Sequence, residues 1–417
     1  GLSGPVVLEG VLEEGLDRVR FNISGTGPET ALTTAGTFGG AETPHLLSAN
    51  SVLVASDLSI FAPLTGLDLT GSAELSVQTQ LDTETYSGTV TLNGTGQNLG
   101  VGNERVDTML AGNATVSARL SRVPGRTNLN SFAVVTPILT ASAVGVLEGE
   151  RRALTLNAKL EDAGLVVESL AGPLSIEGHV TQSGPDRLDV NVTGEGQSFD
   201  LIAVGALSAL DDVPLFIGTA RVDSPDISVF SALAKRPISG EIDVTVEGST
   251  RVDLSTFDLD VAATSVDLIV GQGVADRLLA GRTRYNGKMR RDDDVLRLQE
   301  ASIDSTAAAI SAAGVIAPDA TDLTFDATVK EAALLLRDVS GALNLKGSVR
   351  QTGPDRFALD VTGTGAGTDI AAKGTLETPP EGTAFSGNAR VEVNSLGAFS
   401  QLAGRPLSGS VSLDASG

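Results

Sequence analysis

The chain has 417 residues and a formal net charge of −23, from 52 acidic and 29 basic residues. An acidic excess of this size disfavours nucleic acid and anionic membrane surfaces as direct partners. The absence of cysteine excludes a disulfide framework and any cysteine-based metal or redox site.

The first predicted strand, from Val19 to Gly25, belongs to a repeat with a period of 169 residues. Positions that match at this spacing (187 − 18 = 169) include Arg18, Arg187 and Arg356, and Gly25, Gly194 and Gly363. Self-similarity at a fixed period is typical of repetitive, elongated architectures. Because a single active site does not need three copies of its scaffold, we predict that the protein is not an enzyme.

The period divides the chain into three repeats, which we expect to form one continuous, elongated sheet. We place repeat 1 at residues 1–170, repeat 2 at 171–339 and a truncated repeat 3 at 340–417. The last residue, Gly417, matches Gly248 in the middle of a repeat, and the chain begins with Gly1 rather than Met. We therefore interpret it as a fragment of a longer protein.

Alternation of apolar and polar residues is the dominant local pattern, and it predicts strands with one apolar face. Between them stand turn residues such as Gly184, Pro185 and Asp186. In the register of the repeat, Asp189, Asn191, Asp360 and Thr362 face water. The positions predicted to line the apolar face are Val19, Phe21, Ile23, Leu188, Val190, Val192, Ile242, Val244, Val246, Phe257, Leu259, Val261, Phe357, Leu359 and Val361.

Short helices are predicted at equivalent places in the repeats. The run from Asp226 to Pro237 begins with an acidic cap, followed by apolar residues at helical spacing, and runs from Asp57 and Asn394 resemble it. One phenylalanine recurs in each copy, at Phe61, Phe230 and Phe399, and we expect it to anchor its helix against an end or an edge of the sheet. A second apolar segment, after Glu161 and Glu331, fits either a helix or a strand.

Sites for chemistry are weakly supported by the sequence. His45 and His179 are the only histidines, and neither recurs in the other copies. The run Asp292–Asp294 could bind calcium, but a solvated hairpin tip explains it better. The glycine-rich run from Gly363 to Gly367 lacks the spacing of a dinucleotide loop. We therefore predict no catalytic residues, no metal and no cofactor.

The central question is what covers the apolar face. With roughly 12 to 13 strands per repeat, one repeat would span on the order of 60 Å, and monomers rarely expose so large an apolar patch. The sheet could pack on a second sheet, close into a filled solenoid, or curl into a trough that holds an outside guest. Aromatic residues make up only 3%, which favours the trough. The natural guest for such a trough is a lipid acyl chain.

Each of the segments Asp226–Gly248 and Asn394–Gly417 consists of a predicted short helix, followed by the motif RPISG or RPLSG and then by an alternating strand. This pattern resembles the AsmA-like family, and within it the TamB proteins, the inner-membrane subunits of the bacterial translocation and assembly module. The segment Asp57–Gly71 resembles it less closely. The resemblance implies an all-β, curled, taco-like antiparallel sheet with a hydrophobic groove.

The same resemblance implies a periplasmic protein that is anchored in the inner membrane by a segment absent from this sequence. It further implies phospholipid transport between the two membranes, a role in outer-membrane protein assembly, and a TamA-type outer-membrane barrel as partner. We therefore expect a bridge-like lipid-transfer segment that binds phospholipid acyl chains. The alternative is a surface or secreted β-repeat protein such as an adhesin stalk.

Overall fold

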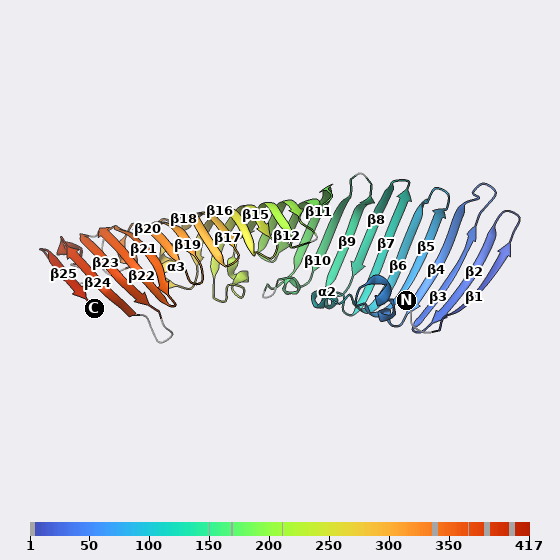
Figure 1. Cartoon of the computed structure of the whole chain (residues 1–417), viewed down its shortest axis with the longest axis horizontal. Coiled ribbons are helices and arrows are strands. Elements are labelled where there is room, and N and C mark those ends of the chain that lie inside the picture. The colour runs from blue at the N-terminus through green and yellow to red at the C-terminus, as the bar shows by residue number, and fades with distance from the viewer. Residues whose placement is uncertain are drawn as a thin grey trace. The chain divides into compact units, whose positions relative to one another are not determined.

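A computed structural model describes residues 5–149, 151–167, 170–210, 212–335, 341–365, 367–378, 384–399 and 405–417. In these residues the chain forms 25 strands and eight short helices. It divides into two compact units, Gly1–Gln197 and Ser198–Gly417, called unit 1 and unit 2 below. Figure 1 draws unit 1 from blue to green and unit 2 from green to red.

Unit 1 is an open antiparallel sheet in which each strand pairs with its neighbours in the chain. Its strands are β1 (Val7–Glu14), β2 (Val19–Gly27), β3 (Thr30–Phe38), β4 (Leu46–Ala55), β5 (Thr70–Asp82), β6 (Ser87–Gly100), β7 (Asn113–Val123), β8 (Arg126–Val135), β9 (Leu139–Glu148), β10 (Ala153–Leu160), β11 (Leu174–Gly184) and β12 (Arg187–Gly196).

Unit 2 has the same antiparallel, strand-by-strand topology. Its strands are β13 (Phe199–Ser208), β14 (Leu215–Ser224), β15 (Ser239–Arg251), β16 (Thr256–Ile269), β17 (Arg282–Asp292), β18 (Val295–Asp304), β19 (Ala308–Ile316), β20 (Asp322–Val329), β21 (Leu343–Gly353), β22 (Arg356–Gly365), β23 (Thr368–Glu377), β24 (Ala384–Val393) and β25 (Val411–Ser416). The predicted fold class, an all-β antiparallel sheet with a few short helices, is confirmed.

The 169-residue period corresponds to ten strands, because Arg187 opens β12, Arg356 opens β22 and Arg18 directly precedes β2 (12 − 2 = 10). The expectation of 12 to 13 strands per repeat was wrong. Several strands are longer than typical strands of globular proteins, such as β6 with 14 residues. The helices and their connections use more of the repeat than the sequence suggested.

Every described helix follows an even-numbered strand, and so the described helices of each unit lie at one edge of its sheet, where the strands end (Figure 1). We call this the helical edge, and the opposite edge, where the odd-numbered strands end, the hairpin edge. The helices are η1 (Leu58–Phe61), α1 (Ala62–Thr65), α2 (Glu104–Met109), η2 (Ala163–Leu165), η3 (Ile227–Phe230), α3 (Gly273–Leu278), η4 (Ala332–Leu334) and η5 (Leu396–Phe399). None of the described helices is long and apolar enough to cross a membrane.

The acidic caps that the sequence predicted are present. Asp57 accepts a hydrogen bond from the Ser59 amide at 2.8 Å, and Asp226 accepts one from the Ser228 amide at 2.9 Å. These backbone bonds, together with bonds from the serine hydroxyls, lower the pKa of both carboxyl groups. The segments after Glu161 and Glu331, which fitted a helix or a strand, form the single helical turns η2 and η4.

The glycine of the RPISG motif is required by the backbone at that point. Gly240 has a φ of +114°, and a Cβ placed there would lie 2.7 Å from the Asp267 carbonyl oxygen. Gly71 occupies the equivalent position, with a φ of +94° and only 2.4 Å from the Asn98 carbonyl oxygen. At both places the register shifts by a β-bulge, which turns the strand as it leaves the helix.

The core of each unit is a seam at the helical edge. Strand residues that are almost fully buried, such as Leu160 and Leu343, lie at the strand ends beside the short helices. Helix residues complete the seam, including Ala163, Ile227 and Ala332. Around Ala332 and Leu343 pack Leu335 and Leu345. The helices therefore cover only the margin of the sheet and leave the rest of its apolar side open.

Candidate apolar binding face

One side of the sheet in unit 1 is apolar across all twelve strands. Residues that are directly opposite in antiparallel strands point to the same side, so the strand register identifies this apolar face. One row across it contains a single polar residue, Thr79, and no charge. From β1 to β12 the row is Leu12, Phe21, Gly36, Ala49, Thr79, Val90, Leu120, Leu129, Gly145, Leu154, Val180 and Val190.

The adjacent row in unit 1 is nearly as apolar. Its two polar side chains, Thr34 and Ser51, are neighbours, and the Thr34 hydroxyl donates to the Ser51 hydroxyl at 3.0 Å. The two groups therefore satisfy each other within the apolar face. The row is Gly10, Ile23, Thr34, Ser51, Val77, Leu92, Ala118, Phe132, Ala143, Leu156, Gly178 and Val192.

Unit 2 has an apolar face of the same kind, and one row across it is built mostly from alanine and glycine. A row without a polar or charged residue crosses all thirteen of its strands. It consists of Ala203, Ala220, Val246, Val261, Gly287, Ala301, Ala312, Phe325, Gly347, Val361, Ala372, Ala389 and Ala415. The small side chains of this row project little from the sheet and leave space above it.

All fifteen apolar residues that the sequence singled out lie on the apolar face of their own unit. Those of β2 and β12 belong to unit 1, and those of β15, β16 and β22 to unit 2. Asp189, Asn191, Asp360 and Thr362 are exposed on the opposite, polar face. The prediction that these fifteen residues contact lipid remains a prediction.

No second layer formed by the described residues of the same unit covers the apolar face. Leu156, on β10 of unit 1, is 42% exposed, and Leu32 and Phe38, on β3, are each 39% exposed. Within either unit, the described strands all belong to a single sheet. Yet Val190, on the same face, is only 9% exposed. Close shielding of one side chain by its neighbours, without a covering layer, is what a sheet curled towards its apolar face produces.

The polar face differs between the two units. In unit 2 it carries cross-strand ion pairs, such as Arg221–Asp243 at 2.6 Å, Lys373–Asp360 at 2.8 Å and Arg350–Asp322 at 3.0 Å. The hydrogen bond from each cation to its aspartate raises the pKa of Arg221 and of Lys373. In unit 1 serine, threonine, asparagine and glutamine predominate on this face. Exposed pairs contribute little stability, so we assign them to solubility and register.

The weaker candidates from the sequence lie on the surface. Asp292 ends β17 and Asp293 has a φ of +50°, as in the tip of a tight hairpin. His45 lies 3.4 Å from Glu84, and His179 is exposed on the polar face. Among the described residues, no group of histidine, aspartate and glutamate side chains has the arrangement of a metal site.

Sequence reasoning missed part of the apolar face, because β-bulges break the alternation. Leu129 and Phe132 share one face although they are three residues apart, since the register shifts between β8 and its neighbours. Leu298 and Ala301 repeat the same break 169 residues later. The helices α2 and α3 were also missed, so repeats 1 and 2 each have a third helical segment that was not predicted. The same three-residue spacing of apolar residues in both copies was the sequence signal that could have revealed the bulge.

The recurring phenylalanines lie in the helical segments. The ring centroid of Phe230 is 5.4 Å from that of Phe199 on β13, in a tilted arrangement. Phe61 is half-buried at the equivalent place in unit 1, and the side chain of Phe399 lies outside the described residues. Two helical segments of unit 2 are also joined by a hydrogen bond, in which Nη2 of Arg277 on α3 donates to the Leu334 carbonyl of η4 at 2.8 Å.

We expect Phe230→Ala to loosen η3 without unfolding unit 2. Because Phe230 is only half-buried, the loss should fall below the roughly 3–5 kcal/mol that is typical of a buried phenylalanine. Amide hydrogen exchange in Ile227–Phe230 should accelerate, while β21 to β23 stay protected. Leu233→Ala, at a position that is 57% exposed, is the matched control and should change little. Unchanged exchange in η3 of the Phe230 variant would refute the anchoring role.

Neither a protein-family model nor a curated protein matches this sequence.

Proposed function

We propose that each unit binds lipid acyl chains along its apolar face, and that the protein is a segment of a bridge-like phospholipid transporter between the inner and outer bacterial membranes. The observation that carries this proposal is the uncharged row that crosses every strand of each unit without a roof. Transport of this kind needs a continuous apolar surface rather than a closed pocket.

The dimensions and energetics of the face support an acyl chain as the guest. Twelve strands at a spacing of about 4.8 Å make roughly 55 Å of apolar surface in unit 1 alone. Each methylene group that leaves water for such a surface contributes about 0.8 kcal/mol. Because the contact is non-directional, a chain can slide from one strand to the next without breaking specific bonds.

The resemblance of the helix–RPISG–strand pattern to AsmA-like proteins supports the wider role. On that resemblance we propose a non-enzymatic protein of the periplasm, anchored in the inner membrane. We further propose that it acts with a TamA-type barrel and contributes to outer-membrane protein assembly. An adhesin stalk would have no use for an unroofed apolar face of this length.

Native mass spectrometry of the purified protein tests the proposal. We expect phospholipid to co-purify with the wild-type protein and to remain bound after the protein is exchanged into detergent-free buffer. A matched sample that carries a charge on the apolar face, Val192→Glu, should retain far less lipid. Wild-type protein that carries no lipid, even after incubation with phospholipid vesicles, would contradict the proposal.

A further inference from the structure

Four arginines gather on two adjacent hairpin tips at the hairpin edge of unit 1. Arg122 and Arg126 flank the β7–β8 tip, and Arg151 and Arg152 follow the end of β9. The tips are close, because a Cβ on Gly149 would lie 3.7 Å from the Gly125 carbonyl oxygen. Residues 122–152 contain these four arginines and two glutamates, a net charge of +2 in a chain of −23 (4 − 2 = 2).

Arg122 stands on the apolar face and not on the polar one. Its strand position pairs with Gly88 on one side and Thr127 on the other, directly beyond the apolar pair Leu120 and Leu129. Its side chain is 51% exposed. A guanidinium therefore lies at the rim of the apolar face, where the apolar surface meets water.

The guanidinium of Arg122 is held in place but not saturated. Its Nη1 lies 3.2 Å from Oε2 of Glu148, and the same oxygen accepts a hydrogen bond from the Thr127 hydroxyl at 2.8 Å. Arg126 is held on the other side of the tip, since its Nε donates at 2.8 Å to Oδ1 of Asn128, whose register partner Ser121 lies on the polar face. Arginine carries five N–H donors in a fork that matches a phosphate. Each of these contacts engages one nitrogen of the guanidinium, and both residues are exposed.

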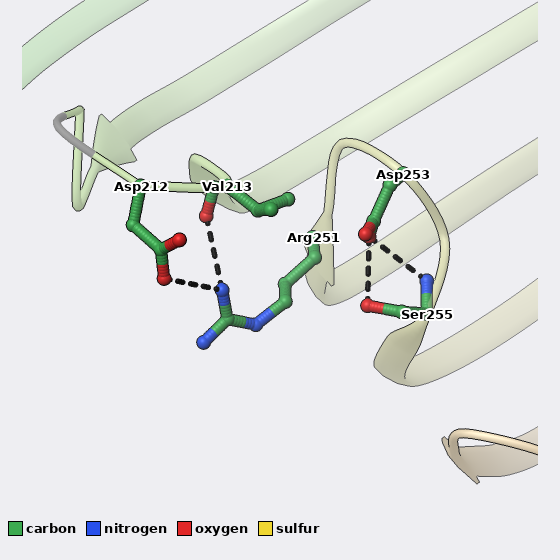
Figure 2. Close-up of polar contacts among 5 residues, drawn as sticks. All are labelled: Asp212, Val213, Arg251, Asp253 and Ser255. Atoms are coloured by element: carbon green, nitrogen blue, oxygen red, sulfur yellow. Dashed lines mark hydrogen bonds and ion pairs between the residues drawn. The ribbon is translucent and has the colours of Figure 1, made fainter.

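The equivalent position in unit 2 has opposite surroundings. Arg291 lies 169 residues after Arg122, and its Nε donates to the Asp293 carbonyl at 2.6 Å. The tip beside it is the acidic run Asp292–Asp294. The neighbouring Arg251 is also engaged, because its Nη1 lies 3.4 Å from Asp212 and 3.1 Å from the Val213 carbonyl oxygen (Figure 2). The second tip in Figure 2 is closed by Asp253, which accepts two bonds from Ser255.

We propose that the arginine rim of unit 1, formed by Arg122, Arg126, Arg151 and Arg152, binds the phosphate of a lipid headgroup whose acyl chains lie on the apolar face. The proposal rests on the proposed function and adds the chemical class of the headgroup. Apolar surface and cationic rim meet at Arg122, so an anionic amphiphile complements both at once. Unit 2, with its acidic tip, would pass the acyl chains without holding the headgroup.

The test compares two lipids with identical acyl chains, dioleoylphosphatidic acid and dioleoylglycerol, in competition for the purified protein. Native mass spectrometry should show that the wild type retains the phosphatidic acid about tenfold or more in excess of the diacylglycerol. The Arg122→Gln/Arg126→Gln/Arg152→Gln variant should lose this preference but keep its diacylglycerol. Arg291→Gln should keep the preference, and Glu148→Gln, which frees Arg122, should increase it.

The outcomes separate this inference from the proposed function. If the wild type retains both lipids equally, the headgroup site is wrong while acyl binding stands. If it retains neither, the proposed function fails. Equal loss of preference in the Arg291→Gln variant would overturn the site, because it would then reflect overall charge. As a further arm, inorganic phosphate is added without lipid. If it raises the thermal unfolding temperature of the wild type while the variants do not differ in lipid retention, the rim binds free phosphate and the headgroup site is wrong. Thermal unfolding of each variant controls for folding.

Discussion

Leu160→Ala is expected to lower the free energy of unfolding of unit 1 by about 2–5 kcal/mol, the range for a buried leucine. Leu160 ends β10 at the helical edge and is only 3% exposed. It pairs with Leu174 on the neighbouring strand β11, and Ala163 of η2 follows it by three residues. Both Leu174 and Ala163 are buried. Removing its side chain would leave a cavity in the seam that holds helices to sheet.

Leu156→Ala, in the same strand and on the same face, is the matched control. Leu156 is 42% exposed, so most of the transfer and cavity cost does not apply, and the loss should stay below about 1 kcal/mol. Denaturant titrations of both variants check the contrast. Equal destabilisation would mean that protein already covers the apolar face, as in the sandwich or filled solenoid.

Leu156→Glu is expected to reduce phospholipid retention by tenfold or more while unit 1 stays folded. A carboxylate that faces hydrocarbon is energetically expensive, and a lipid chain that crosses β10 along either row passes Leu156 or the adjacent face position Leu154. In the free protein, the same carboxylate can reach water because the face has no roof. The measurements are lipid content by mass spectrometry and the thermal unfolding temperature.

Asn157→Glu adds the same charge one residue away, on the polar face, and should leave lipid retention unchanged. The pair separates the effect of the face from the effect of charge on an already acidic chain. Loss of lipid in both variants would point to electrostatic repulsion of the lipid by the whole protein. Unfolding of the Leu156 variant alone would instead indicate a sealed interior.

The parity of the strands could be predicted from sequence because the side-chain period of a strand is two and register errors would reverse every side chain. The prediction that Val190 and Asp189 lie on opposite faces is accordingly confirmed. The acidic caps at Asp57 and Asp226 were equally readable, since a short polar side chain before an apolar run satisfies free amides.

What the sequence did not reveal depends on tertiary geometry. The bulge between Leu129 and Phe132 shifts the parity locally, and no residue type marks it clearly. The helix α2 contains one large apolar side chain before its last residue, Val106, so it carries no apolar stripe. Nor did alternation distinguish Val190, which is 9% exposed, from Leu156 at 42%. That difference arises from curvature and from distance to the helices, not from the alternating pattern.

Site-specific photo-crosslinking from positions 156 and 157 in the intact protein tests the central claim most directly. A crosslinking amino acid at Leu156 should form phospholipid adducts, and the same group at Asn157 should form few or none. Positions 359 and 360 provide the same comparison in unit 2. Strong adducts from both 156 and 157, or from neither, would contradict a one-sided apolar face that carries lipid.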